Sequence, residues 1–345
     1  MKANVLYNIN DLRYEDVAMP EPKSGEVLVN VRACGICGSD INRVFKTGTY
    51  HFPTIIGHEF AGEVKSDARW PKWSGKRVGV FPLKPCFECA NCCDGNYEMC
   101  THYDYLGSRC DGGFAEYVSV PEWNLIELPD GVDFDEAAML EPSAVALHAL
   151  SRVNSLEGKS VAIIGPGTIG NIACQLAKIK GAQSVTMIGR TQQKLDYALA
   201  TSADVAINSR TENVDERVAT MTNGLGFDVV VEGTGANPSL VLAIKVARSG
   251  GDIILLGNPQ GDVILDKQVF WQIMRRQLTL HGTWNSSFGE KHNDWKYVLR
   301  LISEGKLSLK SLITHRLELG ELLKGLEIMR DTSVYSNKVM LFNHE

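Results

Sequence analysis

Hydrophobic and polar positions alternate in two different ways along this chain of 345 residues. Up to about residue 145, short apolar runs are separated by glycine and proline, as in EVLVNVRACGIC, EFAGEV and GGFAEYVSV. Runs of this length and composition, bounded by turn residues, are typical of strands. We therefore expect residues 1–145 to form an irregular, mostly β domain.

Near residue 155 the pattern changes to apolar strands that alternate with helical periodicity. SVAIIG is followed by TIGNIACQLAKIKG, then by SVTMIG and QQKLDYALATSA, and the alternation continues to DIILLG. Strand and helix repeated in this way predict a parallel, doubly wound sheet. We expect this second domain to span residues 146–284.

The alternation stops after residue 284, where the amphipathic stretch HNDWKYVLRLISEG leads into mixed elements that end in NKVMLFN. We expect residues 285–345 to return to the first domain. The predicted fold class is therefore α/β, with a β-rich domain and a doubly wound parallel sheet.

Composition and charge narrow the class of protein. The amino terminus is charged and has no apolar leader segment, and no run reaches 18 uninterrupted apolar residues, so we expect a cytoplasmic protein with no membrane partner. A formal net charge of −6 and an isoelectric point near 5.8 give no overall attraction for nucleic acid. Small molecules are the expected partners.

Five of the nine cysteines lie in one short segment, residues 85–101. Four of them are separated by gaps of two, two and seven residues: Cys86, Cys89, Cys92 and Cys100. This spacing lets four thiolates converge on one tetrahedral ion, so a structural zinc lobe is predicted, with Cys93 pointing away. An iron–sulfur cluster or free thiols are the alternatives.

A second set of candidate metal ligands lies outside this lobe. Cys37 is on a glycine-flanked turn in CGICGSD, and His58 and Glu59 lie between apolar residues in GHEFAG. Thiolate and imidazole are natural zinc ligands, although a single cysteine and a single histidine are more often core residues. Glu141 lies in the apolar run MLEPSAVALHAL, where a metal would satisfy a carboxylate that is costly to bury unpaired. The alternative is a surface helix start capped by glutamate and proline.

The loop GPGTIG follows the strand VAII and opens the helix TIGNIACQLAKIK. A strand before and a helix after are the context in which this pattern indicates dinucleotide binding. Gly165 permits the turn, Gly167 lets backbone N–H groups approach the pyrophosphate, and Gly170 allows close packing of helix on strand. Thr168 and Ile169 begin the helix, whose N-terminus carries a partial positive charge.

The residues after the next strand favour NADP over NAD. NAD enzymes usually have an acidic residue at this strand end, which grips the ribose hydroxyls, whereas the sequence here is GRT. Gly189 removes the carboxylate that would repel a 2′-phosphate. Arg190 and Thr191 can donate hydrogen bonds to that phosphate, and Lys194 lies one turn away. The alternative is a solvent-exposed arginine on a loop.

Six motifs occur in the order found in the zinc-dependent medium-chain alcohol dehydrogenases: CGICGSD, GHEFAG, the four-cysteine lobe, DGGFAEY, EPSAVALHA and GPGTIG. The chain resembles this family over nearly its whole length. It looks similar to the polyol dehydrogenase branch, because Glu141 stands where liver-type enzymes have a cysteine. The resemblance implies a GroES-like catalytic domain, split in sequence around a Rossmann cofactor domain.

The resemblance also implies roles for individual residues. Cys37, His58 and Glu141 would hold a catalytic zinc, with Glu59 as an exchangeable ligand or a residue behind the ligands. Ser39 matches the family hydroxyl that relays a proton from the substrate oxygen. The expected reaction is hydride transfer between a nicotinamide cofactor and an alcohol or ketone, in a homodimer or homotetramer. Many members continue the relay with a histidine three residues further on, where this chain has Asn42.

The expected substrate comes from finer similarities. YDYLGSRCDGGFAEY and GTWNSS resemble the branch that contains galactitol-1-phosphate 5-dehydrogenase, which implies a polyol or polyol phosphate. Arg43, Lys46 and Arg109 are candidate phosphate partners by charge alone. Gly189 departs from that branch, whose enzymes generally use NAD. Unphosphorylated sorbitol, butanediol or threonine substrates are alternatives, and so is a non-catalytic, zinc-stabilised nucleotide-binding protein.

Overall fold

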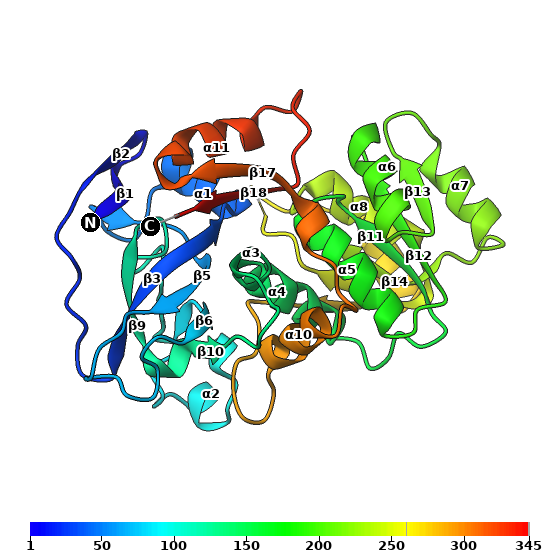
Figure 1. The fold of residues 1–345 in the computed structure, drawn as a ribbon. Coiled ribbons are helices and arrows are strands. Elements are labelled where there is room, and N and C mark those ends of the chain that lie inside the picture. Colours follow the sequence, from blue (N-terminus) through cyan, green and yellow to red (C-terminus); the bar gives the residue numbers. More distant parts are fainter. Residues whose placement is uncertain (260, 344–345) are drawn as a thin grey trace. The chain divides into compact units, whose positions relative to one another are not determined.

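The structure is a computed structural model that describes residues 1–259 and 261–343 (Figure 1). It divides into two compact units: unit 1, which contains Met1–Ala144 and Ser286–Glu345, and unit 2, which contains Val145–Asn285. Gln260, in the predicted second domain, and residues 344–345 of the predicted return segment lie outside the described residues.

Unit 1 is mostly antiparallel β structure. Its largest sheet has the strand order β10-β6-β5-β3-β18-β17, with β9 also paired to β3, and a smaller sheet has the order β2-β1-β4. Its strands are β1 (Lys2–Asn8), β2 (Asp11–Asp16), β3 (Glu26–Gly35), β4 (Thr54–Ile55), β5 (Glu59–Val64), β6 (Arg77–Val80), β7 (Leu83–Lys84), β8 (Asp104–Tyr105), β9 (Tyr117–Pro121), β10 (Leu125–Glu127), β17 (Ile313–Glu318) and β18 (Lys338–Phe342).

Short helices connect these strands. They are α1 (Gly38–Asn42), η1 (Arg43–Thr47), α2 (Ala90–Cys93), η2 (Tyr97–Met99), η3 (Glu122–Asn124), α3 (Phe134–Ala138), α10 (Asp294–Ser303), η4 (Lys310–Leu312), η5 (Leu319–Glu321) and α11 (Leu322–Arg330). The helix α4 (Leu140–Leu150) begins in unit 1 and ends in unit 2.

Strand β18, from the C-terminal part of the chain, lies next to β3, from the N-terminal part, in the largest sheet of unit 1. β18 pairs antiparallel with β3, with Met340 opposite Gly35, and both strands lie side by side in Figure 1. β3 is covered by neighbours, so Val27, Val29 and Val31 are buried in one apolar cluster. This central strand is consequently a rigid support for whatever follows its carboxyl end.

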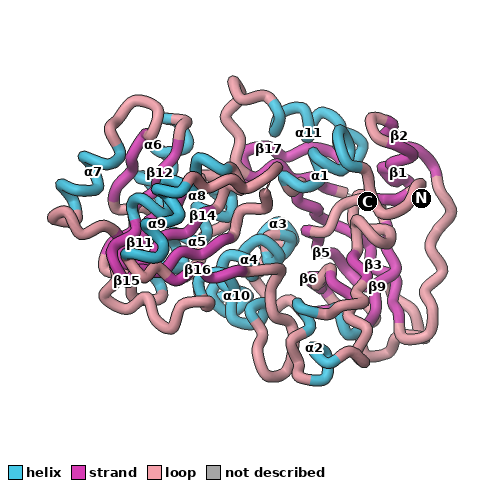
Figure 2. The backbone as a smooth tube through the Cα atoms, turned by 180° about the vertical axis from the view of Figure 1, so that it is seen from behind, coloured by secondary structure: helices cyan, strands magenta, loops and turns pink. Residues whose placement is uncertain are grey.

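Unit 2 is a parallel sheet with the strand order β13-β12-β11-β14-β15-β16, and its strands alternate with helices along the chain (Figure 2). Its elements are β11 (Ser160–Ile164), α5 (Thr168–Ile179), β12 (Ser184–Gly189), α6 (Gln192–Thr201), β13 (Val205–Asn208), α7 (Val214–Met221), β14 (Phe227–Glu232), α8 (Asn237–Val246), β15 (Ala247–Leu255), α9 (Lys267–Arg275) and β16 (Thr279–Gly282).

The order of the strands in unit 2 reverses beside β11, since β12 pairs with one of its edges and β14 with the other. The inner strands are buried apolar runs, as expected for a parallel sheet covered on both faces. In open sheets of this type, ligands bind at the carboxyl ends of the strands where the order reverses. Here that place is occupied by the loop after Ile164.

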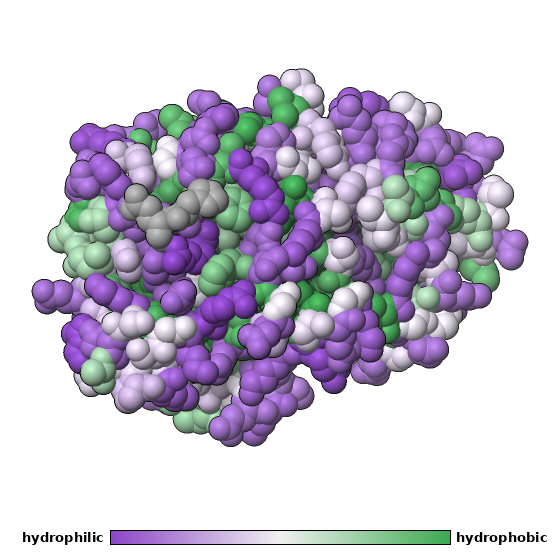
Figure 3. Space-filling view, viewed as in Figure 1, coloured by the Kyte–Doolittle hydropathy of each residue, from purple (hydrophilic) through white to green (hydrophobic). Residues whose placement is uncertain are grey.

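The predicted fold class is confirmed: a β-rich part and a Rossmann-like parallel sheet are combined in one mixed α/β chain. On the face shown in Figure 3, hydrophilic side chains predominate and hydrophobic ones form small scattered groups. Within residues 1–259 and 261–343, none of the helices has the length and apolar character needed to cross a bilayer.

Candidate metal and cofactor sites

The first candidate metal site lies where two strands of unit 1 meet. β3 and β5 pair antiparallel, with Gly35 opposite Glu59. Cys37 follows the end of β3 and is the N-cap residue of α1, while His58 immediately precedes β5. Residues 21 positions apart in sequence are thereby brought to the same end of one strand pair.

Gly57, directly before His58, is held in a backbone conformation that favours glycine, with φ +99°. A later loop packs closely against it. A Cβ atom on Gly107 or Gly112 would lie 2.3 or 2.1 Å from the Gly57 carbonyl oxygen. The glycines of this loop therefore allow an approach that fixes the backbone beside His58.

Cys37, His58 and Glu59 offer ligand atoms that all lie within 4.8 Å of one another. His58 and Glu59 are buried and Cys37 is half-buried. A thiolate, an imidazole and a carboxylate are donors that zinc takes in catalytic sites. The residues present therefore fit a zinc ion, which would compensate the burial of these polar groups.

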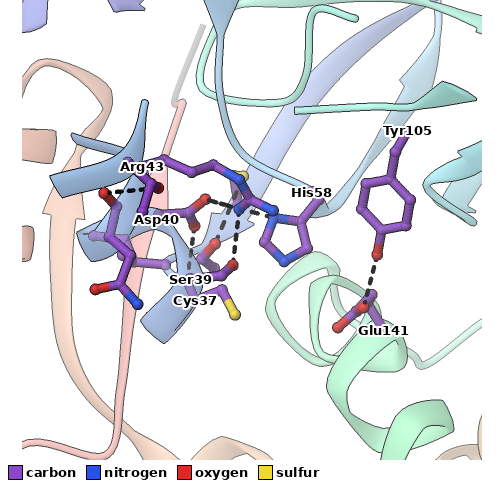
Figure 4. A network of polar contacts seen from close by, with 12 residues as sticks. Cys37, Ser39, Asp40, Arg43, His58, Tyr105 and Glu141 are labelled. Atoms are coloured by element: carbon purple, nitrogen blue, oxygen red, sulfur yellow. Dashed lines mark hydrogen bonds and ion pairs between the residues drawn. The ribbon is translucent and has the colours of Figure 1, made fainter. Parts of the chain in front are cut away.

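Asp40 lies behind His58 (Figure 4). Its Oδ1 atom is 3.6 Å from His58 Nδ1, and its Oδ2 atom accepts a hydrogen bond from the Cys37 backbone N–H at 3.0 Å. The second ring nitrogen of His58 is on the side of Cys37 (Figure 4). A carboxylate behind a histidine orients the ring and increases its basicity as a metal ligand.

Asp40 and His58 each stabilise the charged form of the other. Burial disfavours both charged forms, but His58 and then Arg43 outweigh it and lower the pKa of Asp40 to about 2. In the same way, the Asp40 carboxylate and Cys37 outweigh burial and raise the pKa of His58 well above its usual value.

Glu141 is buried near this group and interacts with Tyr105. Its Oε1 atom accepts a hydrogen bond from the Tyr105 hydroxyl at 3.3 Å (Figure 4), and the Tyr105 ring centroid lies 5.8 Å from that of His58. Burial raises the pKa of Glu141 to about 7, although His58 acts in the opposite direction. Glu141 is not part of the set of described residues whose ligand atoms lie within 4.8 Å, so its role as a zinc ligand stays a prediction.

Glu59 is held by a residue near the end of the chain. Lys338 on β18 forms a buried ion pair with the Glu59 carboxylate and donates a hydrogen bond to the Ile36 carbonyl at 3.1 Å. Burial opposes the charge of Lys338, but Glu59 outweighs it and raises the pKa of this lysine. Sequence reasoning missed Lys338 because nothing in its local pattern links it to residues nearly 280 positions earlier.

Ser39 lies in α1 and is bound to Arg43. The guanidinium Nη1 atom donates hydrogen bonds of 2.8 Å to Ser39 Oγ and to Asp40 Oδ1. The charge of Arg43 is therefore neutralised by a buried carboxylate. The motif CGSD contains Asp40, and its spacing of three residues from Cys37 is a capping pattern that could have identified this carboxylate from sequence.

The four-cysteine lobe gathers its sulfur atoms in one place. The Sγ–Sγ distances are 3.9 Å for Cys86–Cys92, 4.0 Å for Cys89–Cys100 and 3.5 Å for Cys86–Cys100. Thiolates about 2.3 Å from a tetrahedral zinc lie about 3.8 Å from each other, so the residues present fit the ion. Cys93 is exposed and its Sγ lies 3.6 Å from the Glu88 carbonyl oxygen, outside this group.

Backbone groups favour a thiolate within the lobe. The N–H groups of Thr101 and Cys92 lower the pKa of Cys89 to about 5, whereas burial and the neighbouring sulfur atoms raise the pKa of Cys92. Metal ligation requires deprotonated thiols. A bound cation would therefore compensate the negative charge of thiolates gathered in the lobe.

The glycine-rich loop of unit 2 lies after β11. Gly165 has φ +116°, Gly167 is the N-cap of α5 with open space where a Cβ would stand, and a Cβ on Gly170 would lie 2.0 Å from the Gly165 carbonyl oxygen. Thr168 and Ile169 form the first turn of α5 and are half-buried. The loop thus exposes backbone N–H groups at a helix N-terminus, which suits a pyrophosphate.

Glu232, at the end of β14, was not identified from sequence. Its carboxylate accepts hydrogen bonds from the Thr234 N–H at 2.8 Å, the Thr234 hydroxyl at 2.6 Å and the Gly235 N–H at 3.2 Å. It therefore fixes the loop after β14, next to the glycine-rich loop.

The candidate 2′-phosphate residues lie at the end of β12. A Cβ on Gly189 would lie 2.6 Å from Pro166 Cγ, so close packing alone requires glycine here.

The candidate donors that follow Gly189 differ in exposure: Arg190 and Thr191 are exposed, and Lys194 is half-buried, with a pKa that burial lowers. β13 pairs Asn208 with Gly189, so Arg210, which sequence reasoning missed, lies two residues beyond this pair.

Comparisons with known proteins identify the family of the chain. Residues 23–130 match the alcohol dehydrogenase GroES-like domain family, and residues 168–304 match the zinc-binding dehydrogenase family. The chain is 36% identical over 312 residues to galactitol 1-phosphate 5-dehydrogenase of Escherichia coli, with 88% of this chain and 89% of the relative covered. It is 33% identical over 311 residues to a sorbitol dehydrogenase of Halalkalibacterium halodurans, with 88% of each chain covered.

Solved structures give the same picture. The crystal structure of galactitol-1-phosphate dehydrogenase from Escherichia coli matches with a TM-score of 0.92 and 34% identity, over 99% of this chain and 100% of that chain. A zinc-binding dehydrogenase from Sinorhizobium meliloti bound to NADP matches with a TM-score of 0.91 and 29% identity, over 99% of both chains.

A GroES-like part with grouped zinc donors and a Rossmann-like sheet with a glycine-rich loop define a zinc-binding dehydrogenase. The chain belongs to the zinc-dependent medium-chain alcohol dehydrogenase family. The family resemblance stated from sequence is thereby confirmed.

Proposed function

We propose that this protein is an oxidoreductase that transfers a hydride between NADP and the secondary alcohol or ketone of a polyol phosphate. The observation that carries this proposal is the grouping of Cys37, His58 and Glu59, with Asp40 next to His58. The similarity to galactitol 1-phosphate 5-dehydrogenase supports the substrate class.

Cys37 and His58 would hold the catalytic zinc together with a carboxylate. Glu141 is the carboxylate that the resemblance implies, while Glu59 is paired with Lys338. When bound, zinc polarises a substrate oxygen and the nicotinamide accepts or donates the hydride. The residues of the chain orient these groups, as Asp40 does for His58.

Ser39 is the proposed proton donor and acceptor for the substrate oxygen. Because Arg43 donates to Ser39 Oγ, the hydroxyl proton of Ser39 can be directed to another acceptor. An arginine does not accept a proton in proteins, so the relay does not continue through Arg43. With Asn42 in the position of the usual histidine, the proton leaves through water or the cofactor ribose.

A second, structural zinc would be held by the four-cysteine lobe, which gives two zinc ions per chain. The grouping of Cys86, Cys89, Cys92 and Cys100 supports this count. Four thiolate ligands close the coordination sphere, so this ion would stabilise the lobe and take no part in the reaction.

NADP is the proposed cofactor. Arg190, Lys194 and Arg210 form no ion pair with a carboxylate among the described residues, and cations near the end of β12 suit a 2′-phosphate. The NADP-bound relative from Sinorhizobium meliloti supports this preference. The glycine at position 189 is weaker evidence for NADP than the sequence suggested. The close contact with Pro166 requires a glycine there whichever cofactor is bound.

A second candidate substrate is an unphosphorylated polyol, because a sorbitol dehydrogenase is 33% identical to this chain. The chemistry at the metal would be the same. The two candidates differ only in whether an anion is bound at the far end of the substrate.

The proposed assembly is a homodimer or homotetramer. β16 is the edge strand of the unit 2 sheet, and Leu280 on it is 37% exposed, with Phe270 and Met274 on α9 51% and 61% exposed. An edge strand beside exposed apolar side chains can pair with a second copy. Light scattering after size-exclusion chromatography would measure the assembly.

The proposed function is tested by measuring kcat/KM for free and phosphorylated polyols, and for the corresponding ketoses, with NADP and with NAD. We expect turnover with a polyol phosphate and a higher kcat/KM with NADP. No hydride transfer with any of these substrates would contradict the proposal, and one zinc per chain instead of two would favour a non-catalytic nucleotide-binding protein. A clear advantage for NAD would contradict the cofactor assignment alone.

A further inference from the structure

Arg109 lies in the turn after β8, and two aromatic rings pack against its guanidinium group. Its Cζ atom is 4.1 Å from the centroid of the Tyr50 ring and 4.5 Å from that of the Tyr103 ring. Stacked rings attract the cation through their faces, and the Tyr50 and Tyr103 side chains are also hydrogen-bond partners of the guanidinium group.

No carboxylate pairs with Arg109 within the part of the chain that the structure describes, and its buried Nε atom has no hydrogen-bond partner. Other arginines of unit 1, such as Arg13, Arg69 and Arg316, each form an ion pair with an aspartate. Buried donors in folded proteins are nearly always paired. Arg109 therefore carries a positive charge and a donor whose acceptor the folded chain does not supply.

The other two candidate phosphate partners suggested by sequence are less suited to bind an anion than Arg109. Arg43 is paired with Asp40 and donates to Ser39, so its charge is already compensated. Lys46 is an exposed residue in the last turn of η1, where a solvated ammonium needs no partner. Of the three, Arg109 alone combines an uncompensated charge with a fixed environment.

The turn that carries Arg109 is joined to the candidate metal site. The Arg109 N–H donates to the Tyr105 carbonyl at 2.9 Å, and the Tyr105 ring packs beside His58 and bonds Glu141 through its hydroxyl. The Tyr103 ring centroid lies 6.3 Å from that of Tyr105. On the other side, His51 Nε2 is 3.1 Å from the Arg109 carbonyl oxygen. The backbone of Arg109 is thus fixed relative to Tyr105 and Glu141.

We propose that Arg109 binds the phosphate monoester of the substrate, and that it thereby determines the preference for a phosphorylated over a free polyol. The proposal rests on the proposed function. The carbinol carbon would lie at the metal group and the phosphate at the other end of the carbon chain. A guanidinium can bind two phosphate oxygens with parallel N–H groups, which gives both affinity and orientation.

The test compares Arg109→Gln with the wild-type enzyme on one polyol and its phosphate ester. A hydrogen bond to a charged group contributes enough that we expect kcat/KM for the phosphate ester to fall about 10- to 100-fold. For the free polyol it should be unchanged. Arg109→Lys should recover part of the loss, because it restores the charge without the paired N–H groups.

Arg13→Gln is the matched control. Arg13 also lies over a tyrosine ring, with its Cζ 4.6 Å from the Tyr7 centroid, but it is paired with Asp11. We expect this variant to leave the ratio of the two kcat/KM values as in the wild type. If Arg109→Gln lowers kcat/KM equally for both substrates, or for neither, Arg109 does not read the phosphate and the proposal is wrong.

A binding measurement separates this proposal from the proposed function. Inorganic phosphate is titrated calorimetrically into wild type and Arg109→Gln, both saturated with NADP so that the cofactor's own phosphate subsites are filled. Loss of a phosphate site in the variant supports Arg109 as an oxyanion site even if the wild type turns over no polyol phosphate. Equal phosphate binding by both proteins overturns it, whatever the substrate proves to be.

Discussion

Lys338, on the last strand of the chain, forms a buried ion pair with Glu59, which lies beside two candidate zinc ligands. Lys338 also donates to the Ile36 carbonyl at 3.1 Å, next to Cys37. One side chain therefore connects the end of the chain to both halves of the metal group. It holds the Glu59 carboxylate beside Cys37 and His58, close to where a cation would lie.

Replacing Lys338 by methionine should destabilise the protein strongly. The change leaves the Glu59 carboxylate buried without its partner, and breaking a buried pair in this way costs about 3–5 kcal/mol. The free energy of unfolding, measured by urea titration, would show the loss. The double variant Glu59→Gln with Lys338→Met should recover part of it, because no unpaired charge then remains.

Lys324→Met is the control for this experiment. Lys324 pairs with Glu321 at 2.7 Å, but the two side chains are 59% and 37% exposed, so the loss should be about 0–1 kcal/mol. Equal effects of the two lysine substitutions would show that the Lys338–Glu59 pair is not held as described.

Gly189→Ala should disturb the cofactor loop even though it adds no charge. Its Cβ would lie 2.6 Å from Pro166 Cγ, and overpacking of this kind costs about 1–3 kcal/mol. Since Pro166 belongs to the glycine-rich loop, we expect a lower melting temperature and a higher KM for NADP and NAD alike. A change confined to one cofactor would instead assign Gly189 a direct role in reading the 2′-phosphate.

Cys92→Ser should remove the structural zinc, because Cys92 Sγ lies in the group of four sulfur atoms. We expect one zinc fewer per chain and a loss of stability near the upper end for point substitutions, about 4 kcal/mol. Zinc content and urea titration measure the two effects. Cys93→Ser, which changes the exposed neighbouring cysteine, should alter neither quantity, and a similar effect of both substitutions would contradict the assigned ligand set.

The fold class, the cysteine cluster and the glycine-rich loop could be predicted from sequence because their signals are local. The spacing from Cys86 to Cys100 and the GPGTIG loop each lie within a few turns of chain. The alternation of apolar strands and helices from residue 155 onward is also a local pattern, and it predicts a parallel sheet.

The contacts around the candidate metal group of Cys37, His58 and Glu59 were harder to predict, because long-range contacts leave no periodic pattern. Lys338 reaches Glu59 only after β18 joins β3, and Tyr105 on the short strand β8 bonds Glu141 on α4, 36 positions later in the chain. The carboxylate of Asp40 was visible in CGSD, but its position behind His58 depends on how β3 and β5 pair. The requirement for glycine at position 189 came from Pro166, a neighbour that the sequence did not reveal.

The central claim is that Cys37 and His58 hold a zinc ion separate from that of the cysteine lobe. Zinc per chain, measured by mass spectrometry in the wild type and in Cys37→Ala, tests this most directly. The account predicts two ions in the wild type and one in the variant, with the lobe still occupied. A single ion in the wild type, or an unchanged count in the variant, would contradict it.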